Sequence, residues 1–294
     1  MERISFYDQI AKNKRKSVFL MFIVFLVLIL LGYAISYAFD PGYFFVIMIF
    51  SVIFSISYLL ISYYNSDKIA LASVNAQPAN QAQYRQYYNA VEGLTLASGL
   101  PMPKLYIMQN DQINAFASGR DPQHAVICVT NGALEKLNKQ ELEGVLSHEL
   151  SHIANYDIRF ITLVAVMVGM VAIISEMFLR SLWFRGNNRD EGKGNALFLL
   201  IGIVLAILAP IVVQLVQLSI SRKREFTADA TAVKFTRSPT GLVGALKKIK
   251  NDKPMKVNKA VSSLFMSDPA RRKFETMLST HPDINTRIQI LEKM

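Results

Sequence analysis

A short motif in the middle of the chain combines two imidazoles with a carboxylate at helical spacing. Residues 147–153 read Ser-His-Glu-Leu-Ser-His-Ile, and this His-Glu-x-x-His box uses two of the four histidines of the chain. On a helix, His148 and His152 lie one turn apart on the same face, so both can bind one Zn²⁺ ion. Glu149 lies beside them, where it can accept a proton from a water on the metal. The box therefore predicts a zinc hydrolase; the alternative is two surface histidines around a surface glutamate.

A catalytic zinc site needs a third protein ligand and an open fourth position. The candidates lie later in the chain: Asp157, Glu176, Glu225, Asp229 and His281. Glu176 is about 18 residues into an apolar stretch, or roughly 27 Å along a helix, which would put it at the far face of a membrane. Asp157 is five residues beyond His152. We expect Asp157 to point away from the histidine pair and to cap a helix end.

Glu225 is the better candidate for the third ligand. It follows the last apolar stretch of the chain, so we expect it on the same side of the membrane as the histidine pair. Asp229 is one turn further on, where it can accept the free N–H of a ligand histidine and so fix the orientation of that ring. Spacing alone leaves open that Glu225 forms a surface ion pair with Arg222 or Lys223.

Four apolar stretches are long enough to span a bilayer, which takes about 20 residues. They are Val18–Phe39, Tyr43–Tyr64, Ile158–Leu179 and Ala196–Ile220. The first two form a hairpin around the turn Asp40-Pro41-Gly42. The second pair contains interior polar residues, which usually face protein or a water-filled cavity. This second hairpin is therefore predicted to span the membrane, or else to be partly buried in the protein.

The composition agrees with a membrane protein. Of the 294 residues 52% are hydrophobic, while 32 Lys and Arg against 22 Asp and Glu give a net charge of +10. A basic excess is typical of nucleic-acid-binding proteins and of cytoplasmic loops of membrane proteins, and the apolar stretches favour the second. We expect contact with a lipid bilayer and no nucleic-acid partner. Cys128 is the only cysteine, which excludes an intrachain disulfide and a Cys₄ zinc site and fits a reducing compartment.

Basic residues predict the orientation in the membrane. The cluster that precedes the first apolar stretch places the N-terminus inside the cell: Lys12, Lys14, Arg15 and Lys16. The chain then divides into an N-terminal hairpin (1–64), a first cytoplasmic part (65–157), a second hairpin (158–220) and a second cytoplasmic part (221–294). Basic residues between 180 and 193 disagree mildly with this orientation, and the N-terminal cluster outweighs them. Both termini and the active site are therefore predicted to be cytoplasmic.

The soluble segments predict a mostly helical α+β domain of the zincin type with a small sheet. A helical pattern covers Asn80–Gly99, and a sheet of two or three strands is expected next. The expected strands are Lys104–Met108, Gln112–Ala117 and Ala125–Thr130, followed by a turn at Asn131-Gly132. Asn138 and Glu141 predict a capping box at the start of an amphipathic helix that carries the metal box. Later helices are expected around 225–229, at Thr240–Ile249 and at Thr286–Lys293.

The chain resembles the HtpX-type membrane zinc metalloproteases, which are relatives of the CAAX prenyl proteases. The matching motifs occur in order along the chain: Asn114–Pro122, His124–Val126, Thr130–Gly132, His148–His152, Ser221–Ala230, and Ser279–Pro282 followed by Arg287. The resemblance implies that Glu225 is the third ligand of one Zn²⁺ ion per chain. It also implies a multi-pass protein of the bacterial inner membrane that hydrolyses misfolded or damaged membrane proteins.

Further residues are predicted to assist substrate binding or catalysis. His281 is a candidate donor to the oxyanion of the tetrahedral intermediate, or a loop histidine before a proline, and the resemblance favours the first role. Arg287 is a candidate orienting partner in the substrate-binding part of the site. Asn114 begins a run that is expected to be an exposed sheet edge, to which an extended substrate adds as a strand, or else is a plain strand end. His124 is expected to be a strand residue and not a ligand.

Three other classes of protein compete with this interpretation. An intramembrane protease would place the box inside a span, but the charged flank at 138–143 places it in water. A membrane chaperone or scaffold with structural zinc would fill all four positions with Cys or His. A transporter is disfavoured because the soluble segments are large. Chelator-sensitive proteolysis would separate the enzyme from the others, with membrane proteins that carry cytoplasmic segments as the expected substrates. The sequence does not determine the oligomeric state.

Overall fold

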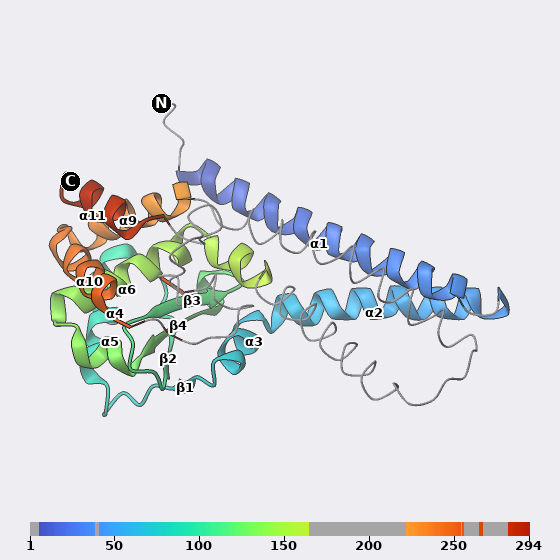
Figure 1. The fold of residues 1–294 in the computed structure, drawn as a ribbon, viewed down its shortest axis with the longest axis horizontal. Coiled ribbons are helices and arrows are strands. Elements are labelled where there is room, and N and C mark those ends of the chain that lie inside the picture. The colour runs from blue at the N-terminus through green and yellow to red at the C-terminus, as the bar shows by residue number, and fades with distance from the viewer. Residues whose placement is uncertain (1–5, 39–40, 165–221, 254, 256–264, 267–281) are drawn as a thin grey trace.

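The computed structural model describes residues 6–38, 41–164, 222–253, 255, 265–266 and 282–294. In these residues a long helical hairpin extends from a body in which helices surround a small sheet (Figure 1). Most of the second predicted hairpin lies outside the described residues, as do Glu176 and His281. Residues 157–164, at its start, are helical. The fold is thus mostly helical with a small mixed sheet, as predicted.

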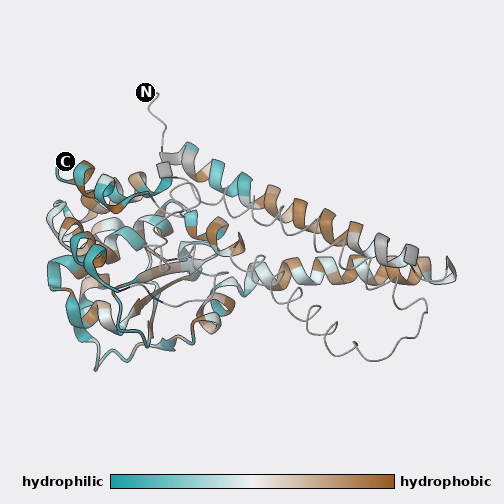
Figure 2. Cartoon of the chain, viewed as in Figure 1, coloured by the Kyte–Doolittle hydropathy of each residue, from teal (hydrophilic) through white to brown (hydrophobic). Residues whose placement is uncertain are grey.

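The hairpin is formed by α1 (Phe6–Ala38), the short 3₁₀ turn η1 (Pro41–Tyr43) and α2 (Phe44–Tyr64). Among the described helices α2 alone is long and apolar enough to cross a membrane, so the count of four spans stays a prediction. Hydrophobic residues line both helices where they extend beyond the body (Figure 2). Aromatic rings that face outwards, such as Phe45 at 76% exposure and Phe50 at 69%, would be unfavourable in water over so large a surface.

The base of the hairpin packs on the body through an apolar cluster. Leu20 on α1 lies against Phe160 and Leu163, which belong to the helical segment that follows the metal box, and Leu59 of α2 packs at the edge of this group. Because Leu20 and Leu163 are 1% exposed, this contact excludes water and fixes α1 relative to the body. The hairpin is therefore attached to the part of the chain that carries the candidate site.

In the part of the chain that the structure describes, the sheet has four strands in the order β1-β2-β4-β3. Its strands are β1 (Gln77–Pro78), β2 (Lys104–Met108), β3 (Ala115–Gly119) and β4 (Ala125–Thr130). β2 and β4 are parallel, while β1 pairs antiparallel with β2 and β3 pairs antiparallel with β4. The predicted bounds of β2 and β4 are confirmed. β3 begins three residues later than predicted, and β1 was not predicted.

Helices surround the sheet in Figure 1. They are α3 (Ser66–Ser73), α4 (Arg85–Ser98), α5 (Asn131–Lys136), α6 (Lys139–Ala154), α9 (Arg222–Thr236), α10 (Thr240–Asn251) and α11 (Ile284–Leu291), with the 3₁₀ turn η2 (Pro122–His124) before β4. The predicted turn at Asn131-Gly132 is wrong, because these residues start α5, where the Thr130 side chain accepts the Ala133 N–H. His124 lies on η2, not on a strand as expected, and its side chain is exposed and bonded to Asp121.

The helix with the metal box, α6, is the centre of the body. Its capping box is confirmed, since the Asn138 side chain accepts the Glu141 N–H and the Glu141 side chain accepts the Asn138 N–H. The prediction of an amphipathic helix is wrong from Gly144 onwards, because both its polar and its apolar residues are buried as far as Ala154. Its hydroxyls are satisfied within the helix, as in the bond from Ser151 Oγ to the Ser147 carbonyl at 2.7 Å.

Two glycines let α6 and α10 approach closely. A Cβ on Gly144 of α6 would lie 2.4 Å from the Leu242 nitrogen, and one on Gly241 would lie 2.1 Å from the Gln140 carbonyl oxygen. Neither position has room for a side chain, so the two backbones are in direct contact. Helices from before and after residues 165–221 thus enclose the metal box.

Candidate metal centre

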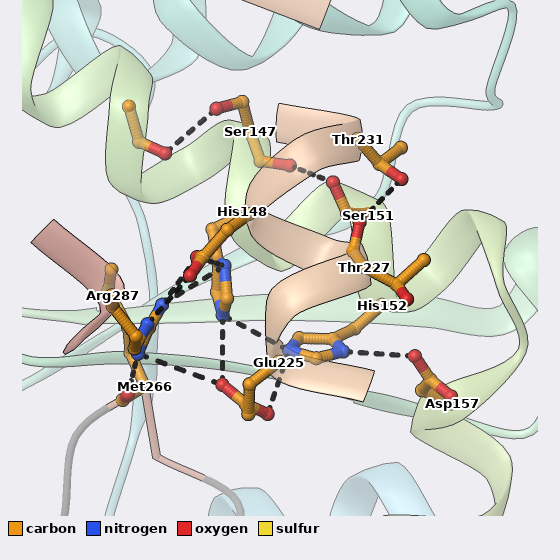
Figure 3. A network of polar contacts seen from close by, with 12 residues as sticks. Ser147, His148, Ser151, His152, Asp157, Glu225, Thr227, Thr231, Met266 and Arg287 are labelled. Carbon is orange, nitrogen blue, oxygen red and sulfur yellow. Dashed lines mark hydrogen bonds and ion pairs between the residues drawn. The ribbon is translucent and has the colours of Figure 1, made fainter. Parts of the chain in front are cut away.

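Three buried side chains from two helices meet at one point. His148 and His152 of α6 and Glu225 of α9 each offer a ligand atom, and these atoms lie within 4.8 Å of one another. His148 Nε2 is 3.5 Å from Glu225 Oε2, His152 Nε2 is 3.6 Å from Glu225 Oε1, and the two Nε2 atoms are 3.2 Å apart. Figure 3 shows the two rings and the carboxylate directed towards one another. His148 and Glu225 are 77 positions apart in sequence, and they meet because α9 packs beside α6.

The ring of His148 is supported by a carboxylate and a guanidinium. His148 Nδ1 lies 2.9 Å from Asp229 Oδ1, one turn after Glu225 on α9. Arg287 of α11 forms a fork on Asp229, from Nε to Oδ2 at 2.8 Å and from Nη2 to Oδ1 at 2.6 Å. A bidentate guanidinium–carboxylate pair is both strong and geometrically specific. Asp229 therefore has a fixed orientation and presents an acceptor to Nδ1.

The electrostatics of this group favour a positive charge at His148. Burial acts to lower the pKa of His148, but hydrogen bonds to Asp229 and Glu225 outweigh burial and raise this pKa to about 9. Burial acts in the opposite sense on Asp229, and the Arg287 and His148 contacts overcome it to hold the pKa of Asp229 at about 2. The pocket thus keeps its carboxylate ionised and stabilises a cation beside it.

The ring of His152 is supported by Asp157, and our sequence expectation for Asp157 was wrong. His152 Nδ1 lies 3.2 Å from Asp157 Oδ2, a contact drawn in Figure 3. A continuous helix would have rotated Asp157 about 140° away from His152. Instead α6 ends at Ala154, and Tyr156 takes a left-handed conformation with φ 58°. The chain changes direction at Tyr156, and this places Asp157 beside His152.

The two supports determine which ring atoms face the centre. Since Asp229 and Asp157 are acceptors, each histidine donates from Nδ1, and when a metal ion replaces the proton on Nε2 each presents a lone pair there. The two Nε2 atoms face each other at 3.2 Å with the Glu225 carboxylate beside them. Three such groups in a buried position repel one another unless a positive charge, from a proton on His148 or from a metal ion, lies between them. The donor set can therefore hold a metal ion.

Glu149 lies on the same helix turn as the cluster and is 1% exposed. Burial raises the pKa of Glu149, and the neighbouring histidines act in the opposite direction. The Ala117 backbone on β3 also forms a hydrogen bond to this carboxylate. Its Oε1 atom is buried and has no hydrogen-bond partner among the described residues. A buried carboxylate oxygen with unused acceptor capacity beside a cation pocket is suited to take a proton.

The predicted substrate residues lie in buried positions. Arg287 is 1% exposed and contacts Asp229 and the Met266 carbonyl, with Nη1 3.7 Å from Glu225 Oε2. Asn114 is 2% exposed, precedes β3, and its Oδ1 accepts the Ala115 N–H. β3 is an edge strand of the sheet, but the expected exposed edge is wrong: the strand is buried and the Met266 N–H occupies the Ala115 carbonyl at 2.9 Å.

Comparison with known proteins places the chain in a family. Residues 78–294 match the model described as peptidase family M48. The chain belongs to peptidase family M48. "Protease HtpX homolog" of Thermoanaerobacter pseudethanolicus is 42% identical over 300 residues, which cover 100% of this chain and 99% of that protein. The protein of the same description from Streptococcus uberis is 37% identical over 98% of this chain and 99% of its own length. The family relationship means that the chain is a metalloprotease.

A solved structure also matches. The crystal structure of S. mikatae Ste24p aligns with a TM-score of 0.47 and 19% sequence identity, covering 96% of this chain. This chain spans 65% of the length of that protein. The match to HtpX homologues along the full chain, together with the apolar helix α2, indicates a bacterial membrane protein.

Sequence reasoning missed two residues that contact the site. Asn13 on α1 donates from Nδ2 to Asp157 Oδ1 at 2.7 Å, and Arg224 Nη1 lies 3.8 Å from the same oxygen. Asn13 stands among lysines and an arginine, where it looks like part of a basic membrane flank. Arg224 directly precedes Glu225, and this adjacency was the one available signal.

Proposed function

We propose that the chain is a zinc endopeptidase of the bacterial inner membrane that cleaves misfolded or damaged membrane proteins at the cytoplasmic face. The observation that carries this proposal is the meeting of three ligand atoms, from His148, His152 and Glu225, beside the buried carboxylate of Glu149. Their separations of 3.2, 3.5 and 3.6 Å are close to the edges of a tetrahedral zinc site, about 3.3 Å when each donor is about 2 Å from the ion.

In this proposal each residue of the site has a separate role in the reaction. A bound Zn²⁺ ion would polarise the scissile carbonyl and lower the pKa of water. His148, His152 and Glu225 hold it and leave one position open. Glu149 takes a proton from the attacking water and delivers it to the leaving amine. Asp229 and Asp157 keep the histidines in the tautomer with a free Nε2. We assign His281, outside the described residues, to the oxyanion.

The general-base role is tested by Glu149→Gln, which keeps the size of the side chain and removes its basicity. The purified full-length variant should bind zinc as the wild type does and cleave a casein-like protein at least about 100-fold more slowly. Chelation should stop the wild type, and added zinc should restore it. Equal cleavage by variant and wild type would end the assignment.

The substrate class is supported by the placement of the protease body at the base of the apolar hairpin (Figure 2). A site beside the bilayer would meet segments of membrane proteins that have lost their fold. Membranes from cells with the wild type and with Glu149→Gln should differ in new peptide N-termini, and these should map to cytoplasmic segments of membrane proteins. New N-termini from soluble proteins alone would contradict the proposed substrate class.

The orientation is supported by the basic cluster at Lys12–Lys16. Cysteines at Gly42, between α1 and α2, and at Lys293 test it with a membrane-impermeant thiol reagent. The native Cys128 gives no background, because it is fully buried and burial raises the pKa of its thiol. Cells should label at Gly42→Cys and label at Lys293→Cys only after lysis. The reverse pattern would place the site outside.

A further inference from the structure

The N-terminal hairpin contacts the metal centre through a chain of buried hydrogen bonds. Asn13 on α1 donates from Nδ2 to Asp157 Oδ1 at 2.7 Å, and Asp157 Oδ2 lies 3.2 Å from His152 Nδ1. Asn13 is 4% exposed and Asp157 is 0% exposed. Because water does not compete for these groups, the bonds are stronger and more specific than surface contacts.

The amide of Asn13 uses both of its hydrogens on the same short segment. One goes to Asp157 Oδ1 and the other to the Asn155 carbonyl at 3.1 Å. These acceptors flank Tyr156, the residue whose left-handed backbone returns Asp157 to His152. Lys14, the next residue of α1, places its ammonium 4.4 Å from the centre of the Tyr156 ring. Helix α1 therefore holds the turn after the metal box on both sides.

The arrangement determines the proton position on His152. Asp157 Oδ1 accepts from Asn13 and lies 3.8 Å from Arg224 Nη1, so this oxygen faces donors. The other oxygen, Oδ2, is directed at His152 Nδ1. Without the Asn13 bond the carboxylate could rotate about its side-chain bonds. The imidazole would then lose a fixed acceptor, and its Nε2 would no longer be held towards Glu225.

We propose that Asn13 is a positioning residue for the metal centre: acting through Asp157, it holds His152 with Nε2 towards the ligand set. The hairpin would then be a working part of the site as well as a membrane anchor. This inference rests on the proposed zinc site, and it adds to that site a residue that lies 135 positions before the box. A plain packing role for Asn13 is the competing explanation.

The test is zinc affinity of the full-length protein, measured by competition with a chromophoric chelator. Asn13→Ala removes both donors and should weaken zinc binding about tenfold or more, the usual effect of losing a group that orients a ligand. Ser17→Ala is the matched control. Ser17 is buried one turn further along α1, and among the described residues its hydroxyl bonds only to the Asn13 carbonyl, so its loss should leave affinity unchanged. Asn13→Leu keeps the branched shape and the number of heavy atoms of the side chain but has no donor, and it should behave like Asn13→Ala.

Two additional measurements separate positioning from packing. With Co²⁺ in place of zinc, the visible absorption bands should change in Asn13→Ala and stay constant in Ser17→Ala, because they report ligand geometry. The affinity losses of Asn13→Ala and Asp157→Asn should not add in the double variant, since both act through one contact. Additive losses, unchanged affinity in both Asn13 variants, or an equal loss in Ser17→Ala would overturn the proposal.

The same series separates this inference from the proposed function. Tight zinc binding by the wild type and its loss in Glu225→Ala uphold the metal site whatever the Asn13 variants do. If those variants then bind zinc as the wild type does, only the positioning role fails. A wild type that does not bind zinc overturns both proposals.

Discussion

The two histidines of the metal box have the same kind of support from different parts of the molecule. Behind His148 stand Asp229 and the fully buried Arg287, both from helices of the protease body. Behind His152 stands Asp157, which is bonded to Asn13 from the N-terminal hairpin. The support of His148 lies entirely in helices of the body, whereas the support of His152 includes a residue of the N-terminal hairpin.

The difference lies in the strength as well as in the origin of the supports. Asp229 receives a charged, bidentate fork at 2.6 and 2.8 Å, whereas Asp157 receives one neutral amide at 2.7 Å and a guanidinium 3.8 Å away. Charge-assisted bidentate bonds are roughly twice as strong as neutral ones. The His148 side is therefore expected to stay in place when the hairpin moves, and the His152 side to respond to it.

The largest effect is expected from Arg287→Ala. Asp229 would keep its charge in a buried position without the guanidinium, which costs about 3–5 kcal/mol for a broken buried pair. Chemical denaturation of the full-length protein should show this loss of unfolding free energy. Arg287→Lys should recover only part of it, because an ammonium cannot form the fork. Stability close to that of the wild type in Arg287→Ala would show that Asp229 does not depend on this contact.

The second-largest effect is expected on zinc affinity, and it compares the supports of the two histidines directly. Asp229→Asn and Asp157→Asn each weaken the acceptor behind one ligand histidine, and each should lower zinc affinity by about 10–100-fold. The loss should be greater for Asp229→Asn, because the charged fork on Arg287 is lost as well. Chelator competition measures both under the same conditions. A greater loss in Asp157→Asn would reverse the order of the two supports.

Much of the fold and of the site could be predicted because it depends on local patterns. The bounds of β2 and β4 follow from apolar runs between proline and turn residues, and the capping box from Asn138 and Glu141. β1 was missed because two exposed residues carry no pattern. The burial of α6 on all sides could not be foreseen, since it depends on α9 and α10, which are distant in sequence.

The error at Asp157 has a specific physical reason. Helical geometry predicts that it faces away from His152, and a single left-handed residue, Tyr156, reverses this. Only Gly and, less often, Asn or Asp favour that conformation, so a tyrosine gave no warning. Asn13 was missed for a related reason: a contact over 144 residues leaves no trace in local spacing.

A smaller effect is expected at the N-terminus of α6. Asn138→Ala removes one half of the capping box and should reduce the unfolding free energy by about 1 kcal/mol. Zinc affinity should not change, because the cap lies ten residues before His148 and contacts neither support. Denaturation and chelator competition on one preparation test both statements. A fall in zinc affinity would mean that the metal site senses helix stability, and the two supports could not then be compared by affinity alone.

The smallest effect is expected at Asp252, far from both supports. Burial acts to raise the pKa of Asp252, but the Ile113 N–H and Lys136 outweigh it and lower the pKa. Its contribution to stability is therefore complete above the ordinary pKa of an aspartate and is lost as pH falls through the lowered pKa. Asp252→Asn should destabilise the protein slightly at pH 7 and not at strongly acidic pH. A destabilisation that grows as pH falls would contradict this sign.

The central claim is that Glu225 completes a metal site with His148 and His152. Elemental analysis of the purified full-length protein tests it most directly. The wild type and Glu149→Gln should each contain about one zinc ion per chain, and Glu225→Ala should contain almost none. Stoichiometric zinc in Glu225→Ala, or none in the wild type, would contradict the account.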